Sequence, residues 1–195
     1  MKAIQQIVIY LNILRFFPHL ICFSLSKNKS VIKLDLEAYK NEYCINSSLY
    51  YSLLHFLFYN RSFRSLFYHR IGNAKWLIQF LGRGMQHLTL TRIPIGSGLL
   101  LFHAYGTILN AKSIGKNCRI VHNVTLGDKN GEKPVIKDNV EILTNAVIVG
   151  GITIGNNCVI GPGAVVFKSI PDNCVVVGNP AYILKENGVV VNRKL

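Results

Sequence analysis

The sequence predicts a mainly β protein, a parallel β-helix of six-residue repeats preceded by a small α-helical domain. An aliphatic residue recurs every six positions from Ile136 to Val166, and a small or apolar residue follows each one four positions later. Neither an α-helix nor a single alternating strand has this period. It fits the flat face of a triangular coil, with three hexapeptides and about 18 residues per turn. The aliphatic positions are Ile136, Ile142, Ile148, Ile154, Ile160 and Val166, and the small or apolar ones are Val140, Ala146, Ile152, Cys158, Ala164 and Ile170.

The aliphatic residues are expected to point inward and to stack from coil to coil, because a single coil cannot bury its own faces. The same frame is visible upstream at Ile108, Ile114, Ile120 and Leu126, with Cys118 and Val124 in the small slot. Cys118 and Cys158 are therefore expected in the core as small hydrophobic residues. The chain has no CxxC spacing that would indicate a zinc site, and the cysteine usage favours a reducing cytoplasm.

One interruption breaks the phase of the repeat. Leu126 to Ile136 is ten residues, four more than the period, and the extra stretch around 128–133 is polar with an Asn-Gly turn signal. We expect a loop that leaves the coil at a corner. Insertions in repeat proteins often line the functional face.

The first part of the chain, residues 1–89, is predicted to be an α-helical domain, followed by the β-helix at 90–186 and a tail at 187–195. Helices are expected at Leu49 to Tyr59, Ser62 to Arg70 and Lys75 to Leu88, with their aromatic residues packed in a core. Near the N-terminus, Ile7 to Leu14 is apolar but too short to span a bilayer. It is interpreted as a buried helix, with an interfacial helix on the inner membrane leaflet as the alternative.

The chain is basic, with a net charge of +13, and its first half carries most of the excess. Residues 1–92 hold 12 Lys and Arg against three acids, whereas residues 93–195 hold ten against six. Such asymmetry is compatible with nucleic acid, an anionic membrane or an anionic ligand. No nucleic-acid-binding motif accompanies it, so nucleic acid is not expected as a partner.

His103 is the candidate for chemistry. It lies between an apolar run and a Gly-bearing turn, where the coil begins. Imidazole titrates near neutral pH and can accept the proton of an alcohol as its oxygen attacks. On spacing alone, a packed or capping histidine is the more common interpretation.

A resemblance supports the chemical interpretation. The stretches Ile95-Gly96…Gly98-Leu99…His103-Ala104…Gly106, Ile114-Gly115-Lys116-Asn117, Val124-Thr125-Leu126-Gly127 and Val177-Gly178-Asn179-Pro180-Ala181 resemble the serine acetyltransferase family. Members of that family are left-handed β-helix acyltransferases. The resemblance covers about residues 90–186. It implies acetyl-CoA as donor, no metal, a homotrimer or dimer of trimers, active sites between adjacent subunits, and His103 as general base.

The sequence also departs from the family pattern. The family has an aspartate immediately before the histidine, where this chain has Phe102, and an Arg-His pair in the loop, where it has Glu132-Lys133. A further family aspartate, which orients the base, falls in the carboxylate-free stretch 88–91. A zwitterionic substrate needs charged partners once it is desolvated, whereas Phe102 offers a flat apolar surface. The departures therefore favour a sugar of a capsule or exopolysaccharide precursor as acceptor.

The resemblance also suggests binding residues. Coenzyme A is expected along a groove between coil stacks, where small residues expose the backbone. The cofactor candidates are Gly127, Thr144, Ala146, Gly161 and Ala164, with Lys168 and Lys185 for the phosphates. The acceptor candidates are Phe102, His122, Glu132 and Lys133.

Three functions remain open at this point. The preferred one is O-acetyl transfer to a sugar. The first alternative is a serine O-acetyltransferase of cysteine biosynthesis, and the second is a non-catalytic β-helix scaffold. A cytoplasmic protein is expected in each case, with contact at the inner membrane surface through the basic, apolar N-terminus as an added hypothesis.

Overall fold

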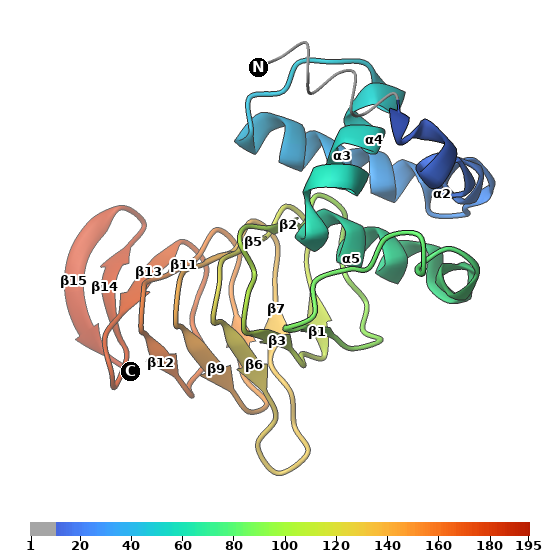
Figure 1. The fold of residues 1–195 in the computed structure, drawn as a ribbon. Helices are drawn as coiled ribbons and strands as arrows, with labels where there is room; N and C mark the ends of the chain where they lie inside the picture. The colour runs from blue at the N-terminus through green and yellow to red at the C-terminus, as the bar shows by residue number, and fades with distance from the viewer. Residues whose placement is uncertain (1–10) are drawn as a thin grey trace. The chain divides into compact units, whose positions relative to one another are not determined.

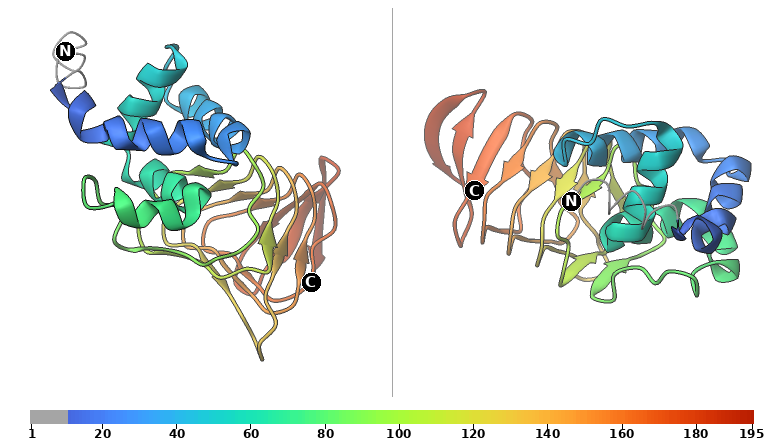
Figure 2. Two further views of the ribbon diagram at one scale, coloured as in Figure 1. Left: turned by 90° about the vertical axis from the view of Figure 1, so that its right-hand side faces the viewer. Right: turned by 45° about the horizontal axis from the view of Figure 1, so that its top comes forward.

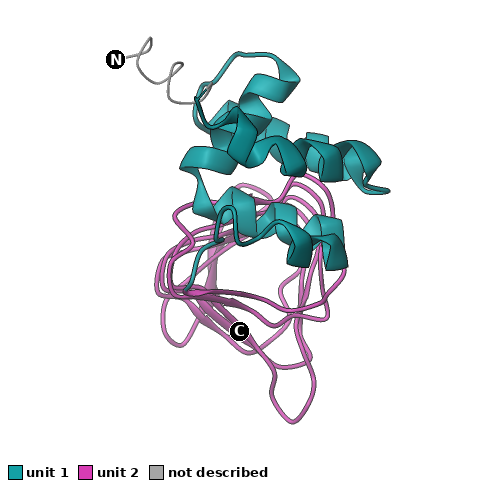
Figure 3. Cartoon of the chain, turned by 45° about the vertical axis from the view of Figure 1, so that its right-hand side comes forward, with its two compact units in different colours: residues 1–86 teal, residues 87–195 magenta. Residues whose placement is uncertain are grey.

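The structure, a computed structural model, describes residues 11–195 and divides into two compact units, residues 1–86 and 87–195 (Figure 3). The first four residues of the predicted apolar stretch at Ile7 to Leu14 lie outside the described residues.

The described part of the first unit is helical. It contains α2 (Ile13–Leu25), α3 (Lys29–Glu42), α4 (Leu49–Tyr59), α5 (Arg61–Ile71) and the 3-10 helix η1 (Gly72–Leu77). The helices expected at Leu49 to Tyr59 and Ser62 to Arg70 are confirmed. Asn60 caps α5 by accepting a hydrogen bond from the Phe63 backbone N–H at 2.9 Å. Gly72 ends the helix with φ +63°.

The helix predicted at Lys75 to Leu88 is wrong. The 3-10 helix ends at Leu77, and Leu88–Leu90 forms a β-strand of the second unit. The intervening chain is held by packing rather than by helix propensity. A Cβ added to Gly82 would lie 2.9 Å from the ring of Phe16 on α2. Glycine therefore lets the backbone approach this ring at a distance that a residue with a side chain does not allow.

Aromatic side chains fill the core of the helical unit, as the sequence predicted. Phe56, Phe63 and Phe67 are each 1% exposed, and Tyr39 is fully buried. The Tyr39 ring meets those of Phe56 and Phe63 edge-on at 5.6 and 5.1 Å. The aromatic spacing of this unit is thus explained by packing.

The second unit is a left-handed parallel β-helix, and its stacked coils can be followed in Figures 1 and 2. Successive strands visit three faces in turn. Face A holds β1 (Leu88–Leu90), β3 (Thr107–Leu109), β6 (Thr125–Gly127), β9 (Val147–Val149) and β12 (Val165–Val166). Face B holds β4 (Ser113–Ile114), β7 (Val135–Ile136) and β10 (Thr153–Ile154). Face C holds β2 (Leu100–Leu101), β5 (Arg119–Ile120), β8 (Glu141–Ile142), β11 (Val159–Ile160), β13 (Cys174–Val177), β14 (Tyr182–Glu186) and β15 (Val189–Lys194).

The predicted inward stack is confirmed from Ile136 to Val166, where the six aliphatic positions are at most 1% exposed. Parallel pairing places equivalent residues one coil apart, such as Ile120 beside Ile142 and Ile142 beside Ile160. Cys118 and Cys158 lie in the core as expected. Burial raises the pKa of the Cys118 thiol to about 11, so this residue stays an uncharged packing group.

The frame proposed at Ile108 is wrong. Ile108 points outward and is 43% exposed, whereas Thr107 and Leu109 are buried. The pairing explains the difference, because Leu109 is the residue that lies beside inward Leu126. Strand residues alternate faces, so a shift of one position exchanges inside and outside.

A ladder of asparagines holds the corner between faces B and C. Asn117, Asn139, Asn157 and Asn173 all have left-handed backbone, with φ between +53° and +59°. The side-chain Nδ2 of each of the first three donates to Oδ1 of the asparagine one coil further on, at N···O distances of 3.3, 3.0 and 2.9 Å. Asparagine tolerates left-handed backbone better than most residues. The ladder keeps successive coils in phase.

The insertion after Leu126 forms a projecting loop, as predicted (Figure 1). Lys129 and Glu132 exchange two backbone hydrogen bonds, of 2.9 and 3.1 Å. Asn130 and Gly131 between them both have positive φ. Two such residues make the tight turn that suits a β-hairpin.

The residues predicted as a tail, 187–195, continue the β structure. Strand β15 pairs antiparallel with β14, which pairs antiparallel with β13. Three consecutive valines of β15, from Val189 to Val191, are exposed.

Candidate active site

His103 lies in a corner that is two residues longer than its equivalents. Seven residues separate inward Leu101 from inward Leu109, whereas five separate Ile120 from Leu126 one coil on. The Phe102 backbone N–H donates to the Ile120 carbonyl, and the Val121 backbone N–H donates to the Ile142 carbonyl one coil further on. Phe102 and Val121 therefore occupy equivalent positions on successive coils. The two extra residues are therefore His103 and Ala104.

The backbone of His103 is unusual as well. It has φ +50° and its side chain is exposed. Among the described non-glycine residues with positive φ, nine are asparagine, and the two exceptions are Cys44 and His103. A left-handed residue of another type persists only where its surroundings hold it, and such residues gather at functional sites. The longer corner and this backbone together present the imidazole outside the coil.

The ring beside His103 is Phe102. The two ring centroids are 4.3 Å apart with an interplanar angle of 72°, an edge-to-face contact. The Arg119 guanidinium lies over the Phe102 ring, 4.8 Å from its centroid. Arg119 Nη1 in turn donates to Glu141 Oε1 at 2.6 Å. Phe102 and His103 are predicted from the sequence, whereas Arg119 and Glu141 are not, because residues one coil apart are not neighbours in sequence.

The same corner, between faces C and A, carries three other predicted residues on the following coils. The backbone N–H of the residue after His122 donates to the Tyr105 carbonyl, and the backbone N–H of the residue after Thr144 donates to the His122 carbonyl. Tyr105, His122 and Thr144 therefore occupy equivalent positions on successive coils. Thr144 Oγ1 lies 3.5 Å from His122 Nδ1. Gly161 lies at the same corner one coil further on. The structure therefore places Phe102, His103, His122, Thr144 and Gly161 along one edge.

The other predicted residues follow the corner between faces A and B. Gly127 ends β6, and its carbonyl accepts from the Gly150 backbone N–H at 3.1 Å. Glu132 and Lys133 belong to the projecting loop that starts at this corner, and the Glu132 side chain packs on Gly151. Within one chain, Glu132 and Lys133 are thus separated from His103 by the width of face A.

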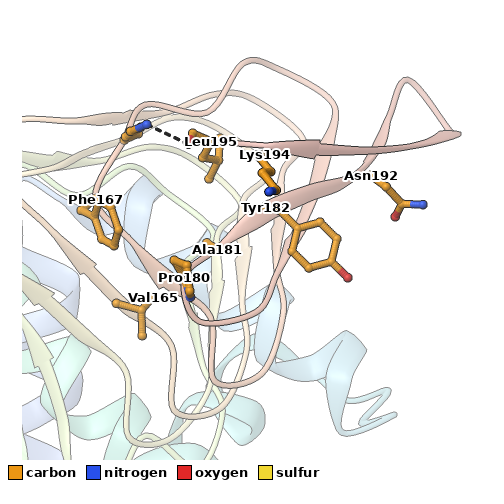
Figure 4. A pocket seen from close by; sticks show the side chains of 9 residues that line it. Val165, Phe167, Pro180, Ala181, Tyr182, Asn192, Lys194 and Leu195 are labelled. Atoms are coloured by element: carbon orange, nitrogen blue, oxygen red, sulfur yellow. Dashed lines mark hydrogen bonds between the residues drawn. The ribbon is translucent and has the colours of Figure 1, made fainter.

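Two hollows follow this second corner and share Phe167. One, of about 460 Å³, is lined by the loop residues Lys129, Asn130 and Glu132 and by residues 149–152. The other, of about 520 Å³, is shown in Figure 4 and includes Lys168, Tyr182 and Lys194 in its lining. The Lys168 ammonium donates to the Leu195 carbonyl at 2.7 Å.

Lys194 was missed by the sequence analysis. It pairs with Tyr182, which follows Pro180-Ala181. Strand β15 therefore adds a second cation to the hollow that contains Lys168. The position of Lys194 beside Tyr182 depends on the pairing of β14 with β15. No motif in residues 187–195 indicates that pairing.

Three predicted cofactor residues lie elsewhere. Ala146 and Ala164 are fully buried, with side chains in the core, so they offer a ligand only backbone atoms. Lys185 is exposed on β14, beside Val175 of face C, and is not among the residues that line either hollow.

Two further observations concern residues 11–195. They contain no cluster of three or more His, Cys, Asp or Glu side chains placed to hold a metal ion. None of their helices combines the length and the apolar character that crossing a bilayer requires.

The fold defines a class of protein. A left-handed parallel β-helix of six-residue repeats is the architecture of the hexapeptide-repeat transferases. Residues 133–168 match the family model described as bacterial transferase hexapeptide, six repeats.

Two relatives and two solved structures define the family more closely. A serine acetyltransferase of Bacillus subtilis is 33% identical over 153 residues, covering 75% of this chain and 70% of the relative. One from Bacillus pumilus is 34% identical over 142 residues, covering 65% of each chain. The crystal structure of Neisseria gonorrhoeae serine acetyltransferase in complex with serine has a TM-score of 0.69 and 31% identity, covering 87% of this chain and 74% of that one. The Brucella abortus enzyme in complex with coenzyme A has a TM-score of 0.69 and 26% identity, covering 87% and 73%.

The chain belongs to the serine acetyltransferase family. It spans just under two thirds of the length of the Bacillus pumilus relative.

Proposed function

We propose that the protein transfers the acetyl group of acetyl-CoA to a hydroxyl oxygen, with His103 as the general base. The observation that carries the proposal is the exposed imidazole on left-handed backbone, at the enlarged corner of a chain of this family. A positioned base of this kind contributes typically about 10²–10⁴ in rate.

The reaction balances without a metal. The His103 imidazole takes the proton of the acceptor hydroxyl while the hydroxyl oxygen forms a bond to the thioester carbonyl carbon of acetyl-CoA. The oxyanion then collapses, the C–S bond breaks, and the imidazolium returns its proton to the departing thiolate. An N–H donor near the oxyanion is expected to stabilise it.

The hollows at the corner between faces A and B support acetyl-CoA as donor. Lys168 and Lys194 supply positive charge in the larger hollow, as nucleotide phosphates require. The smaller hollow is lined in part by Gly150 and Gly151, small residues of the kind expected beside a pantetheine chain. The Brucella abortus structure compared above is a complex with coenzyme A.

A homotrimer, or a dimer of trimers, follows as part of the proposal. His103 and the Glu132-Lys133 loop occupy different corners of the β-helix, so neither corner of a single chain forms the whole site. Juxtaposing the first corner of one copy with the second corner of the next brings them together. Size-exclusion chromatography with light scattering tests this, and a monomer that is fully active would contradict it.

L-Serine is the proposed acceptor. The relatives and neighbours compared above are named serine acetyltransferases, and one structure contains serine. They favour serine over the sugar acceptor that the sequence analysis preferred, and no comparison supports a capsule or polysaccharide substrate.

The sugar acceptor is kept as the second candidate because of Phe102 and the carboxylate-free strand at Leu88–Leu90. Thiol release from acetyl-CoA, measured with L-serine and with a panel of hexoses and nucleotide sugars, separates the two. Turnover with serine alone supports the first proposal, and turnover with a sugar alone replaces it. No turnover with any acceptor, and no acetyl-CoA binding, would leave the scaffold hypothesis.

We also propose peripheral contact with an anionic membrane surface through the helical unit. Leu14 and Leu25 of α2 are 88% and 80% exposed, and Trp76, Leu77 and Phe80 are exposed as well. The three acids of this unit all lie on α3, so its other described elements carry no acidic side chain. Apolar residues together with lysine and arginine are typical of interfacial binding.

Co-sedimentation with vesicles tests this contact. Binding to phosphatidylglycerol vesicles, weaker binding to phosphatidylcholine, and loss of binding in Trp76→Ser/Phe80→Ser are expected. Equal partitioning of variant and parent would contradict the proposal. A change of oligomeric state in the variant would assign the face to a second copy.

A further inference from the structure

The proposed base, His103, makes no hydrogen bond to a carboxylate among the described residues. The described residues offer the His103 ring no hydrogen-bond partner. The strand at Leu88–Leu90 contains no acidic side chain that could orient the ring. The terminal torsion of histidine is broad, so an exposed imidazole turns freely unless a neighbour restrains it. The proposed reaction needs a fixed ring nitrogen.

Three residues on successive coils of face C supply a restraint. Arg119 and Glu141 are register partners on β5 and β8, and Phe102 immediately follows β2, which pairs with β5. The contacts run in sequence from Glu141 to Arg119 at 2.6 Å, from Arg119 to the Phe102 ring at 4.8 Å, and from Phe102 to the His103 ring at 4.3 Å.

Each contact in this series fixes an orientation. The charge-assisted bond to Glu141 holds the guanidinium. The planar guanidinium lies over the Phe102 ring and restrains its tilt, which a lysine ammonium does not do in the same way. The edge-to-face contact then sets the plane of the imidazole.

We propose that Glu141 and Arg119 are positioning residues that orient the general base His103 through Phe102. The inference rests on the proposed function. It also gives Phe102 a second role, besides that of an apolar surface for the acceptor.

The two roles predict different kinetics. A positioning chain acts on the chemical step, so Arg119→Lys and Glu141→Gln should each lower kcat about tenfold while KM stays within about twofold, because small misplacements cost rate more than binding. Phe102→Tyr keeps the ring and should retain activity, whereas Phe102→Leu should lose it. Because Arg119 and Glu141 form one chain, their double variant should be no slower than the worse single variant.

Lys137→Met is the matched control. Lys137 also makes a cross-coil ion pair, at 3.7 Å to Asp172, away from the His103 corner. Its kcat should equal that of the parent, and the melting temperature of every variant should be measured beside its rate. Unchanged kcat in Arg119→Lys and Glu141→Gln would overturn the inference, and so would a loss of kcat that merely follows the melting temperature.

The failure of this inference is distinguishable from that of the proposed function. If His103→Ala is inactive while Arg119→Lys is unaffected, the assignment of His103 as base is supported and the positioning role of Arg119 is contradicted. If His103→Ala keeps its activity, the proposed function itself is contradicted.

Discussion

Acidification is expected to weaken the protein through one buried histidine of the helical unit. His19 is fully buried, and its Nε2 lies 2.8 Å from the Tyr68 hydroxyl. That hydroxyl donates to the Gly82 carbonyl, so it accepts from Nε2–H, and Nδ1 is left as a buried atom without a partner. A second proton would place a charge and an unsatisfied donor in the core. Burial, with the nearby Arg64 and Arg15, lowers the pKa of His19 to about 4.

The sign and size follow from linkage. The unfolded chain, with a histidine pKa of about 6.5, binds this proton more readily than the folded one, so stability is complete above that pH and falls as the pH drops towards 4. At about 1.4 kcal/mol per pKa unit, the loss is about 2 kcal/mol at pH 5 and about 3 kcal/mol below pH 4.

Urea unfolding followed by far-UV circular dichroism at pH 7.5 and pH 5 measures this loss. His19→Gln is the comparison, because glutamine retains a donor for Tyr68 and does not titrate. Contributions from carboxylates and from His55, whose pKa is also lowered by burial, cancel between parent and variant. A difference of about 2 kcal/mol in the pH-dependent loss is expected. An equal loss in parent and variant would refute the reasoning.

Three further predictions concern the core, a buried ion pair and the donor site. Ile148→Ala should lower the unfolding free energy by roughly 2–5 kcal/mol, whereas Ile108→Ala, at an exposed position, should cost under about 1 kcal/mol; equal losses in urea titrations would reject the inward assignment. Asp35→Ala leaves the buried Arg70 without the carboxylate 2.8 Å away and should cost roughly 3–5 kcal/mol, so a loss below about 1 kcal/mol would contradict the pairing. Lys194→Met should weaken acetyl-CoA binding several-fold in calorimetry, and unaltered affinity would exclude it from the donor site.

The six-residue period predicts the core of the β-helix well because burial recurs with the same phase on every regular coil. It fails at Ile108 for a definable reason. The His103 corner is two residues longer than its equivalents, and only four residues separate Leu109 from Ile114, one fewer than the period allows. Ile108 and Ile114 are therefore six apart, although only Ile114 is inward.

The site was only partly predictable for related reasons. His103 carries a local signal in its sequence neighbours. The separation of His103 from Glu132-Lys133 depends on which corner each occupies, and Arg119 reaches Phe102 only because the coils stack. Similarly, the close approach of Gly82 to Phe16 overrides the apparent helix at Lys75 to Leu88, since tertiary packing decides such segments.

The proposed function depends on the exposed histidine at the enlarged corner acting as the base for acetyl transfer. The most direct measurement compares His103→Ala with the parent protein, using thiol release for turnover and calorimetry for acetyl-CoA binding. We expect turnover to fall by about 10²–10⁴, while the dissociation constant for acetyl-CoA stays within about threefold, a free-energy change of under about 0.7 kcal/mol. Turnover equal to that of the parent would contradict the assignment of His103.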